Sequence, residues 1–131
     1  MAGSRNVLEL HGSVHRNYCV AYGACYDAAW VMQTESVPHC EKCGAKVKPN
    51  VVLYEESLPE KALTEAVTEI GKADLLLVGD TSLTVYPAAG LLRYFSGKYL
   101  VLLNRDATPM DEKADLVIRA PIGEVLGQIR V

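Results

Sequence analysis

Two continuous apolar runs in the second half of the sequence constrain the fold more than any other feature. The first covers residues 74–79 and the second covers residues 99–103. Runs this short without polar alternation are typical of strands buried on both faces of a parallel sheet. A helical pattern separates them at 87–96, with Pro87 at its start and Gly97 after its end. The order strand, helix, strand predicts an α/β fold with a parallel sheet.

The neighbouring segments extend this pattern. We expect strands at 51–54 and 114–118, and helices at 59–71 and 122–129. Three or four short strands make only a partial sheet, which leaves an apolar edge exposed. Ligands of parallel sheets bind at the carboxyl ends of the strands. The polar residues that follow two of the predicted strands at that edge are Gly79, Asp80, Thr81, Ser82, Asn104, Arg105 and Asp106.

All four cysteines lie within residues 15–50, a segment with little hydrophobic periodicity. We therefore expect a small, loop-rich module that is held together by something other than an apolar core. Cys40 and Cys43 have the Cys-x-x-Cys spacing of a zinc knuckle, and a structural zinc site takes four ligands. The first pair is irregular, because Tyr22 stands three residues after Cys19, where a second cysteine belongs.

The spacing leaves more than one ligand set open. Cys19, Cys40 and Cys43 are the predicted core of the site, and Cys25 is the first candidate for the fourth ligand. The other candidates are His15 and His39. The alternative is a module without metal, in which the four thiols are free or buried.

Charge and hydropathy exclude several classes of protein. The net charge of the 131 residues is −3, so no basic excess is present to bind a nucleic-acid backbone. No apolar run approaches the roughly 18 residues of a membrane span, and the first residues lack the apolar stretch of a signal peptide. We expect a cytoplasmic protein, in which thiols bind metal or take part in catalysis rather than form disulfides.

Five motifs in order resemble one family. They are Glu9-Leu10-His11-Gly12-Ser13, the cysteine module, the segment from Lys48 to Glu56, the segment from Thr81 to Gly90, and Leu103-Asn104-Arg105-Asp106. Together they resemble the C-terminal half of a bacterial sirtuin, an NAD-dependent protein-lysine deacylase. Each motif alone is weak, but five in register through nearly the whole chain are specific.

The resemblance implies a division of the chain into three segments. Residues 1–14 would be a sheet and active-site segment, 15–50 a small zinc-ribbon-like module, and 51–131 the C-terminal half of a Rossmann-like NAD-binding domain. The first half of that domain, with its glycine-rich phosphate loop, has no counterpart here. We therefore expect a truncated chain that is inactive alone. The alternatives are a non-catalytic, zinc-containing peptide-binding module and a fragment without function.

The resemblance also assigns roles to residues. His11 would be the general base, which activates a ribose hydroxyl while the acyl group passes to ADP-ribose. An acyl-lysine peptide would add as a strand beside residues 52–56, and the residues implied are Val52, Glu55 and Glu56. NAD would be bound by Gly79, Asp80, Thr81, Ser82, Asn104, Arg105 and Asp106. Asp80 stands where the family has glycine, which adds bulk and negative charge near a pyrophosphate.

Overall fold

The computed structural model describes residues 3–129 of the chain, and residues 1, 2, 130 and 131 lie outside this range. The chain divides into two compact units between Ala62 and Leu63. The first unit thus joins the predicted 1–14 and 15–50 segments with the residues up to Ala62. Each unit is described by itself below.

The first unit is built on a three-stranded antiparallel sheet. β1 is the central strand, with β2 on one side and β3 on the other. The helix α1 follows β2 directly, and the Asp27 carboxylate caps it by accepting a hydrogen bond from the Trp30 backbone N–H at 2.7 Å. The elements are β1 Gly12–Cys19, β2 Cys25–Asp27, α1 Ala28–Met32 and β3 Val47–Val51.

The core of this unit is small and contains two of the cysteines. Cys19, Cys40 and Val47 are buried, and the rings of Tyr26 and Trp30 pack against them. Gly12, at φ +74°, lies so close to β3 that any side chain there would collide with the carbonyl oxygen of Asn50. The close pairing of β1 with β3 therefore requires glycine at this position.

One expectation for this part of the chain was wrong. The strand expected at 51–54 in the parallel sheet is instead Val47–Val51, and it pairs antiparallel with β1. Three strands and a short helix run through the cysteine module, with loops between them. The sequence pattern does not indicate β3, because Lys48, Pro49 and Asn50 stand between its two valines and proline is depleted in strands.

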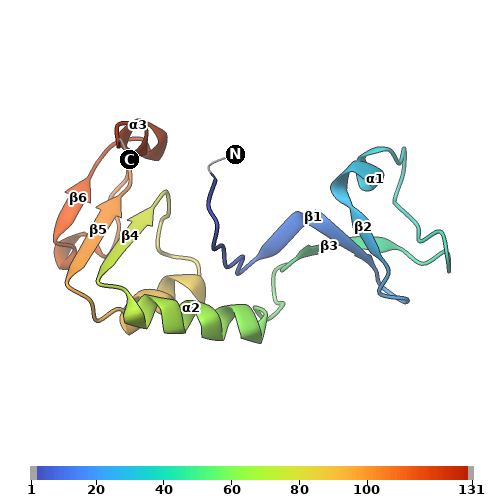
Figure 1. Ribbon diagram of the computed structural model, residues 1–131, viewed down its shortest axis with the longest axis horizontal. Helices are drawn as coiled ribbons and strands as arrows, with labels where there is room; N and C mark the ends of the chain where they lie inside the picture. Colours follow the sequence, from blue (N-terminus) through green and yellow to red (C-terminus); the bar gives the residue numbers. More distant parts are fainter. Residues whose placement is uncertain (1–2, 130–131) are drawn as a thin grey trace. The chain divides into compact units, whose positions relative to one another are not determined.

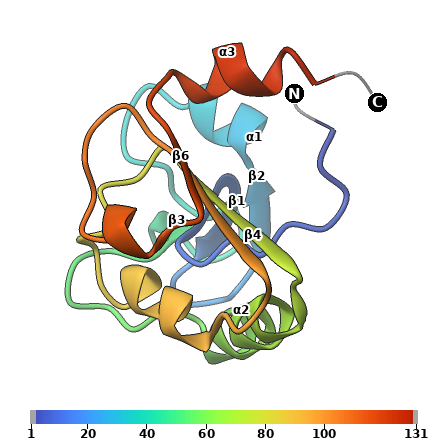
Figure 2. The same ribbon diagram turned by 90° about the vertical axis from the view of Figure 1, so that its left-hand side faces the viewer.

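The second unit carries the predicted parallel sheet. Its strands lie in the order β4, β5, β6, with every pair parallel and β5 in the centre. Figure 1 and Figure 2 show α3 beyond the ends to which these strands point. A side chain at Gly79 would lie 2.5 Å from Ile122, so glycine permits α3 to pack against the end of β4. The elements are α2 Glu60–Lys72, β4 Leu75–Gly79, η1 Ala88–Tyr94, β5 Tyr99–Leu103, η2 Asp111–Lys113, β6 Leu116–Ile118 and α3 Ile122–Leu126.

The predicted order of strands and helices in this unit is confirmed, with η2 as an additional short helix and with two further local differences. The helix expected at 87–96 is a 3-10 helix over Ala88–Tyr94. The expectation that the 74–79 run is buried on both faces was wrong, because Leu75 and Leu77 are 53% and 42% exposed. Their neighbours Leu76 and Val78 point the other way and pack on the core around Leu102.

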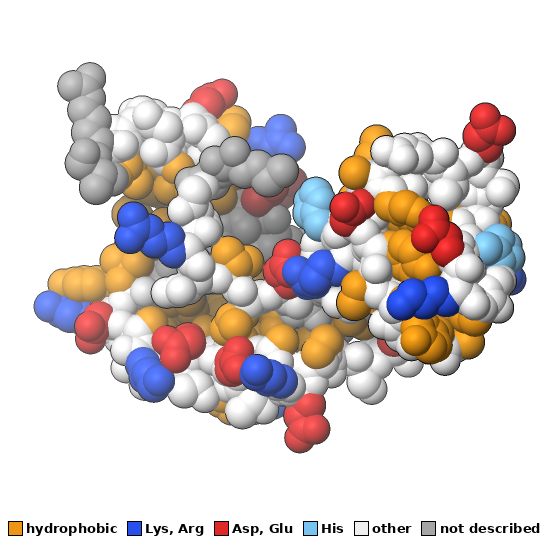
Figure 3. All heavy atoms as spheres, turned by 45° about the vertical axis from the view of Figure 1, so that its right-hand side comes forward, with side chains coloured by type: hydrophobic (Ala, Val, Ile, Leu, Met, Phe, Trp, Pro, Cys, Tyr) orange, Lys and Arg blue, Asp and Glu red, His pale blue; other side chains and the backbone are white. Residues whose placement is uncertain are grey.

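Hydrophobic and charged side chains are interspersed on the face drawn in Figure 3. None of the helices within residues 3–129 combines the length and the hydropathy that crossing a bilayer requires.

Candidate nucleotide site and cysteine cluster

The carboxyl ends of β4 and β5 bring the two predicted polar clusters together. The backbone N–H of Asp80 donates to the carbonyl of Leu103 at 3.1 Å, which extends the pairing one residue beyond the strands. The backbone N–H of Thr81 then donates to the Asn104 side-chain oxygen at 2.9 Å. The clusters are 23 residues apart in sequence, and the parallel register of the two strands places them side by side.

Asn104 is held in a fixed orientation by three hydrogen bonds. Its side-chain oxygen accepts from Thr81, and its side-chain NH₂ donates to the carbonyl of Asp106 at 2.9 Å. Its backbone N–H donates to the carbonyl of Ile118 at the end of β6. Asn104 thus ties together the ends of all three strands, where ligands of such sheets bind.

A hollow of about 200 Å³ lies at this edge of the sheet. Of the predicted nucleotide-site residues, Asp80, Asn104 and Arg105 line it, and the start of α3 forms its other side. Complete small-molecule sites occupy about 300 Å³ or more. The hollow therefore has room for part of a dinucleotide.

Asp80 has the backbone conformation of a glycine. Its φ is +50°, in the left-handed region that residues other than Gly, Asn and Asp rarely adopt. Its side chain is exposed at the rim of the hollow. An aspartate at this position is therefore compatible with the turn after β4, and it adds a carboxylate beside the hollow.

In the first unit, His11 and Val52 are joined through their backbones. His11 directly precedes β1 and is exposed, and its carbonyl oxygen accepts a hydrogen bond from the Val52 N–H at 3.0 Å. The candidate base and the candidate peptide-binding segment are therefore adjacent. Beyond Val52 the chain does not remain extended, because the Glu56 N–H bonds the Leu53 carbonyl in a turn.

The Glu56 carboxylate is bound by partners within its own unit. It accepts a hydrogen bond from the Leu53 N–H at 3.0 Å and pairs with the Lys48 ammonium at 2.8 Å. These two contacts, the Leu53 N–H first, hold the pKa of Glu56 below its ordinary value of 4.5. Glu55 precedes it at φ +70° and is exposed. Contact of Glu55 and Glu56 with a substrate peptide stays a prediction.

This pairing predicts a pH-dependent contribution to stability. A carboxyl whose pKa is lower in the folded state stabilises the fold above pH 4.5, and that contribution is lost as the pH falls through the folded-state pKa. We expect Lys48→Met to move the pKa of Glu56 upward towards 4.5, and the conservative Lys48→Arg to keep it low. Carboxyl ¹³C NMR titration measures this directly. An unmoved Glu56 pKa in Lys48→Met would contradict the assigned pair.

Three of the four cysteines form a cluster in the first unit. The sulfur atoms of Cys19, Cys40 and Cys43 lie within 4.8 Å of one another, and those of Cys19 and Cys43 are 3.4 Å apart. Cys19 and Cys40 are buried, whereas Cys43 is exposed. Three thiolates converging on one point are the donor set that zinc prefers, so this cluster could hold zinc.

Tyr26 is part of this cluster and was missed in the sequence. Its hydroxyl donates to the Cys40 sulfur at 3.2 Å and accepts from the Glu41 N–H at 3.1 Å. The hydrogen bond from Tyr26 is the main cause that lowers the pKa of the Cys40 thiol to about 6. A metal-binding thiol must be deprotonated, so this contact prepares Cys40 as a ligand. No spacing rule singles out this tyrosine, because β2 brings it to the cluster.

The other candidate ligands lie outside the cluster. Cys25 is exposed, and its thiol contacts the Gly23 carbonyl at 3.9 Å. His39 has its Nδ1 atom 2.8 Å from the Gly44 carbonyl oxygen, and His15 is exposed on β1. Within residues 3–129, no further His, Cys, Asp or Glu joins the three sulfurs.

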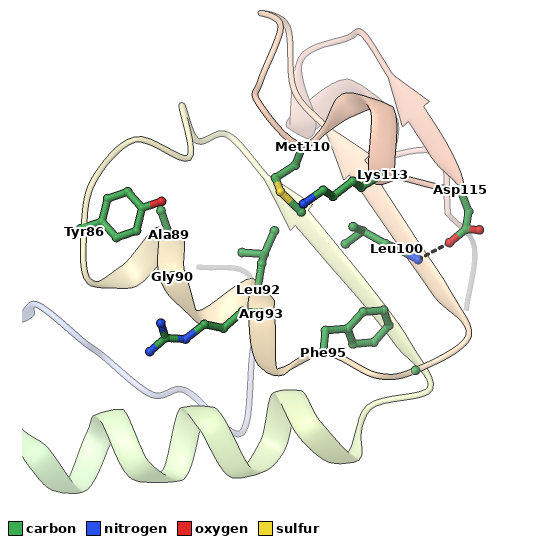
Figure 4. Close-up of a pocket in the computed structure, with 11 residues that line it drawn as sticks. Tyr86, Ala89, Gly90, Leu92, Arg93, Phe95, Leu100, Met110, Lys113 and Asp115 are labelled. Carbon is green, nitrogen blue, oxygen red and sulfur yellow. Dashed lines mark hydrogen bonds between the residues drawn. The ribbon is translucent and has the colours of Figure 1, made fainter.

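A larger hollow of about 530 Å³ lies near the amino ends of β5 and β6. Figure 4 shows Leu92, Phe95, Leu100 and Met110 around it, with the hydrogen bond from the Leu100 N–H to Asp115 at its rim. None of the predicted site residues lines it. It is therefore separate from the nucleotide site at the carboxyl ends of the strands.

The chain matches a known protein family and is similar in sequence to several curated proteins. Residues 1–87 match the model of the Sir2 family. The chain is 56% identical over 130 residues to an NAD-dependent protein deacetylase of Clostridium perfringens, covering 98% of this chain and 53% of that protein. A relative of the same description from Clostridium acetobutylicum is 55% identical, with 96% and 52% covered.

Solved structures with a similar fold belong to the same family as the sequence relatives. A Sir2 structure with an inhibitor, 2′-O-acetyl-ADP-ribose and a deacetylated p53 peptide has a TM-score of 0.89 and 39% identity over 97% of this chain and 56% of its own. A Sir2 structure with a propionylated peptide gives a TM-score of 0.90 at 39% identity and the same coverage. The chain spans about half the length of the curated relatives it matches. The parallel sheet corresponds to the Rossmann-like domain of these proteins, and the chain belongs to the Sir2 family.

Proposed function

We propose that this chain supplies the general base, the acyl-lysine-binding segment and one wall of the nucleotide site of an NAD-dependent protein-lysine deacylase. The observation that carries the proposal is the 2.9 Å hydrogen bond from Thr81 to Asn104. It joins two motifs of the family at the sheet edge where nucleotides bind. The relatives' description as NAD-dependent protein deacetylases supports the same reaction.

Different residues of the chain have different roles in this reaction. NAD supplies the ADP-ribose that accepts the acyl group as nicotinamide leaves. His11, an exposed imidazole, takes the proton from a ribose hydroxyl, a role that histidine side chains commonly fill in general base catalysis. Thr81, Ser82 and Asn104 offer hydroxyl and amide groups to the ribose and phosphates. Arg105 adds a positive charge at the hollow.

Peptide binding uses the segment beside His11. The Val52 N–H is bonded to the His11 carbonyl, which holds Val52 in the short extended segment where we expect an incoming acyl-lysine peptide to pair. The turn from Leu53 to Glu56 limits such pairing to the first residues of the segment. The cysteine cluster stabilises β1 and β3, which hold this segment, when it binds zinc.

The test is an assay of NAD-dependent deacetylation of an acetyl-lysine peptide. Because the chain spans about half of its relatives, the assay uses a chimera. In it, residues 1–131 replace the corresponding half of the Clostridium perfringens relative. We expect NAD-dependent turnover by the chimera and none by the 131-residue chain alone. An inactive chimera that binds acetyl peptide without regard to NAD would favour a peptide-binding module instead.

Asp80 is expected to weaken NAD binding in this chimera. We expect Asp80→Gly to lower KM for NAD about fivefold to tenfold, since an exposed charge contact is worth roughly 1 kcal/mol. Asp80→Asn keeps the side chain's tolerance of positive φ and removes only the charge, so it should recover most of this gain. Initial rates over a range of NAD concentrations measure both. Unchanged KM in both variants would show that the carboxylate points away from the nucleotide.

We also propose that the protein acts in the cytoplasm. All four cysteines are free thiols, and the cluster needs reduced sulfur to bind metal. Fractionation of cells that produce the tagged protein would test this location.

A further inference from the structure

The two loops that carry the cysteine cluster have the same backbone geometry. In the first loop, the Cys19 N–H donates to the Ala24 carbonyl, and the Gly23 N–H donates back to the Cys19 carbonyl. In the second, the Cys40 N–H donates to the Ala45 carbonyl, and the Gly44 N–H donates back to Cys40. Gly23 and Gly44 have φ values of +71° and +72°. Both loops are therefore knuckles of one kind.

Tyr22 occupies the position in the first knuckle that Cys43 occupies in the second. The Tyr22 N–H donates to the Cys19 sulfur at 3.2 Å, and the Cys40 sulfur has backbone hydrogen bonds from Lys42 and Cys43. Two equivalent knuckles present four ligand positions, which are residues 19, 22, 40 and 43. Only three of them carry sulfur.

Cys25 does not reach the fourth position. It lies directly opposite Tyr18 in the antiparallel pairing of β1 and β2, so its side chain shares a face with that of Tyr18. Cys19 is the next residue on β1 and points to the other face. Bringing the Cys25 sulfur to the cluster would break this register.

Tyr22 and Tyr26 do not fill the position either. The Tyr22 side chain is 60% exposed, and its ring lies under the Lys42 ammonium, 5.3 Å from it. A phenol oxygen is several bonds farther from the backbone than a cysteine sulfur, so it does not take the place of that sulfur. The Tyr26 hydroxyl is engaged by Cys40 and Glu41. Both tyrosines, with Cys25, Glu41 and Lys42, line a hollow of about 630 Å³.

We propose that Cys19, Cys40 and Cys43 bind zinc with an open fourth position, taken by water and accessible to a small thiol or imidazole. The site is then exchangeable, whereas four-thiolate sites are closed. This inference does not depend on the proposed deacylase activity, because it concerns metal binding by the first unit alone.

The test uses the full chain loaded with Co²⁺, whose visible absorption reports its ligands. We expect imidazole to shift the cobalt bands of the wild type and to leave those of Tyr22→Cys unchanged. Tyr22→Cys should also bind Zn²⁺ more tightly, on the order of 100-fold, because a fourth thiolate completes the site. Competition with a chelator measures the affinity.

Cys25→Ser is the matched control, since it removes a thiol close by in sequence. We expect it to leave the cobalt spectrum, the imidazole shift and the affinity unchanged. A weaker sulfur-to-cobalt absorption in Cys25→Ser would identify Cys25 as the fourth ligand and overturn the proposal. A wild-type spectrum that ignores imidazole, or a wild-type chain that binds no cobalt, would overturn it equally. Each outcome is read without a deacetylation assay.

Discussion

Replacing His11 by alanine in the chimera is expected to lower kcat for NAD-dependent deacetylation by about 10²- to 10⁴-fold. A positioned general base contributes a factor of this size, and alanine cannot accept the proton. His11 is exposed, and its backbone carbonyl, not its ring, makes the contact with Val52. The substitution therefore removes the imidazole and leaves the pairing of the segment intact. Steady-state kinetics with an acetyl-lysine peptide measure the effect.

His15 provides the matched control for this experiment. It lies four residues further on, is exposed on β1, and its backbone N–H bonds the Ser13 hydroxyl. We expect His15→Ala to retain kcat within about twofold, since substitutions of exposed residues away from the site and the core usually have small effects. Binding of acetyl peptide should persist in His11→Ala. If His11→Ala kept wild-type kcat, the general base would have to be another residue.

Replacing Leu102 by alanine is expected to destabilise the second unit by about 2–5 kcal/mol, the usual cost of a Leu→Ala change in a packed core. Leu102 is 1% exposed in the central strand β5 and packs with Leu83 and Leu100. Alanine leaves a cavity that the rigid parallel pairs on both sides cannot close. Urea unfolding followed by circular dichroism measures the loss.

Leu75→Ala is the control for this change. Leu75 is 53% exposed on β4, so the same substitution there should cost less than about 1 kcal/mol. Equal losses for the two variants would mean that the outer face of β4 is covered in solution. That outcome would contradict the exposure of Leu75 and Leu77 described above.

Several features could be read from the sequence because they depend on local pattern. The apolar run at 99–103 predicted β5, and the helix expected at 59–71 is α2 over Glu60–Lys72. The Cys-x-x-Cys of Cys40 and Cys43 predicted a knuckle, and both sulfurs are in the cluster. Apolar runs and ligand spacings extend over only a few residues, so they can be recognised in the sequence.

Other features depended on which strands pair. The placement of Val47–Val51 beside β1 was decided by partners 28 to 39 residues away, and the mixed sequence of this strand carries no periodic signal. Leu75 is exposed together with Tyr99 on the central strand β5, so this face of the sheet is uncovered in the second unit, which the apolar run does not reveal. A hydrophobic pattern describes a single segment, whereas the burial of that segment depends on which other elements pack against it.

The sequence by itself determined the family, the parallel strands and the residues from which a metal and a nucleotide site could be built. Only the tertiary structure decided which of them meet. It joined Thr81 to Asn104, placed Tyr26 on Cys40, and turned Cys25 away from the cluster. The physical reason is that strand register fixes the face on which each side chain lies, and register is set by long-range pairing rather than by neighbours in the chain.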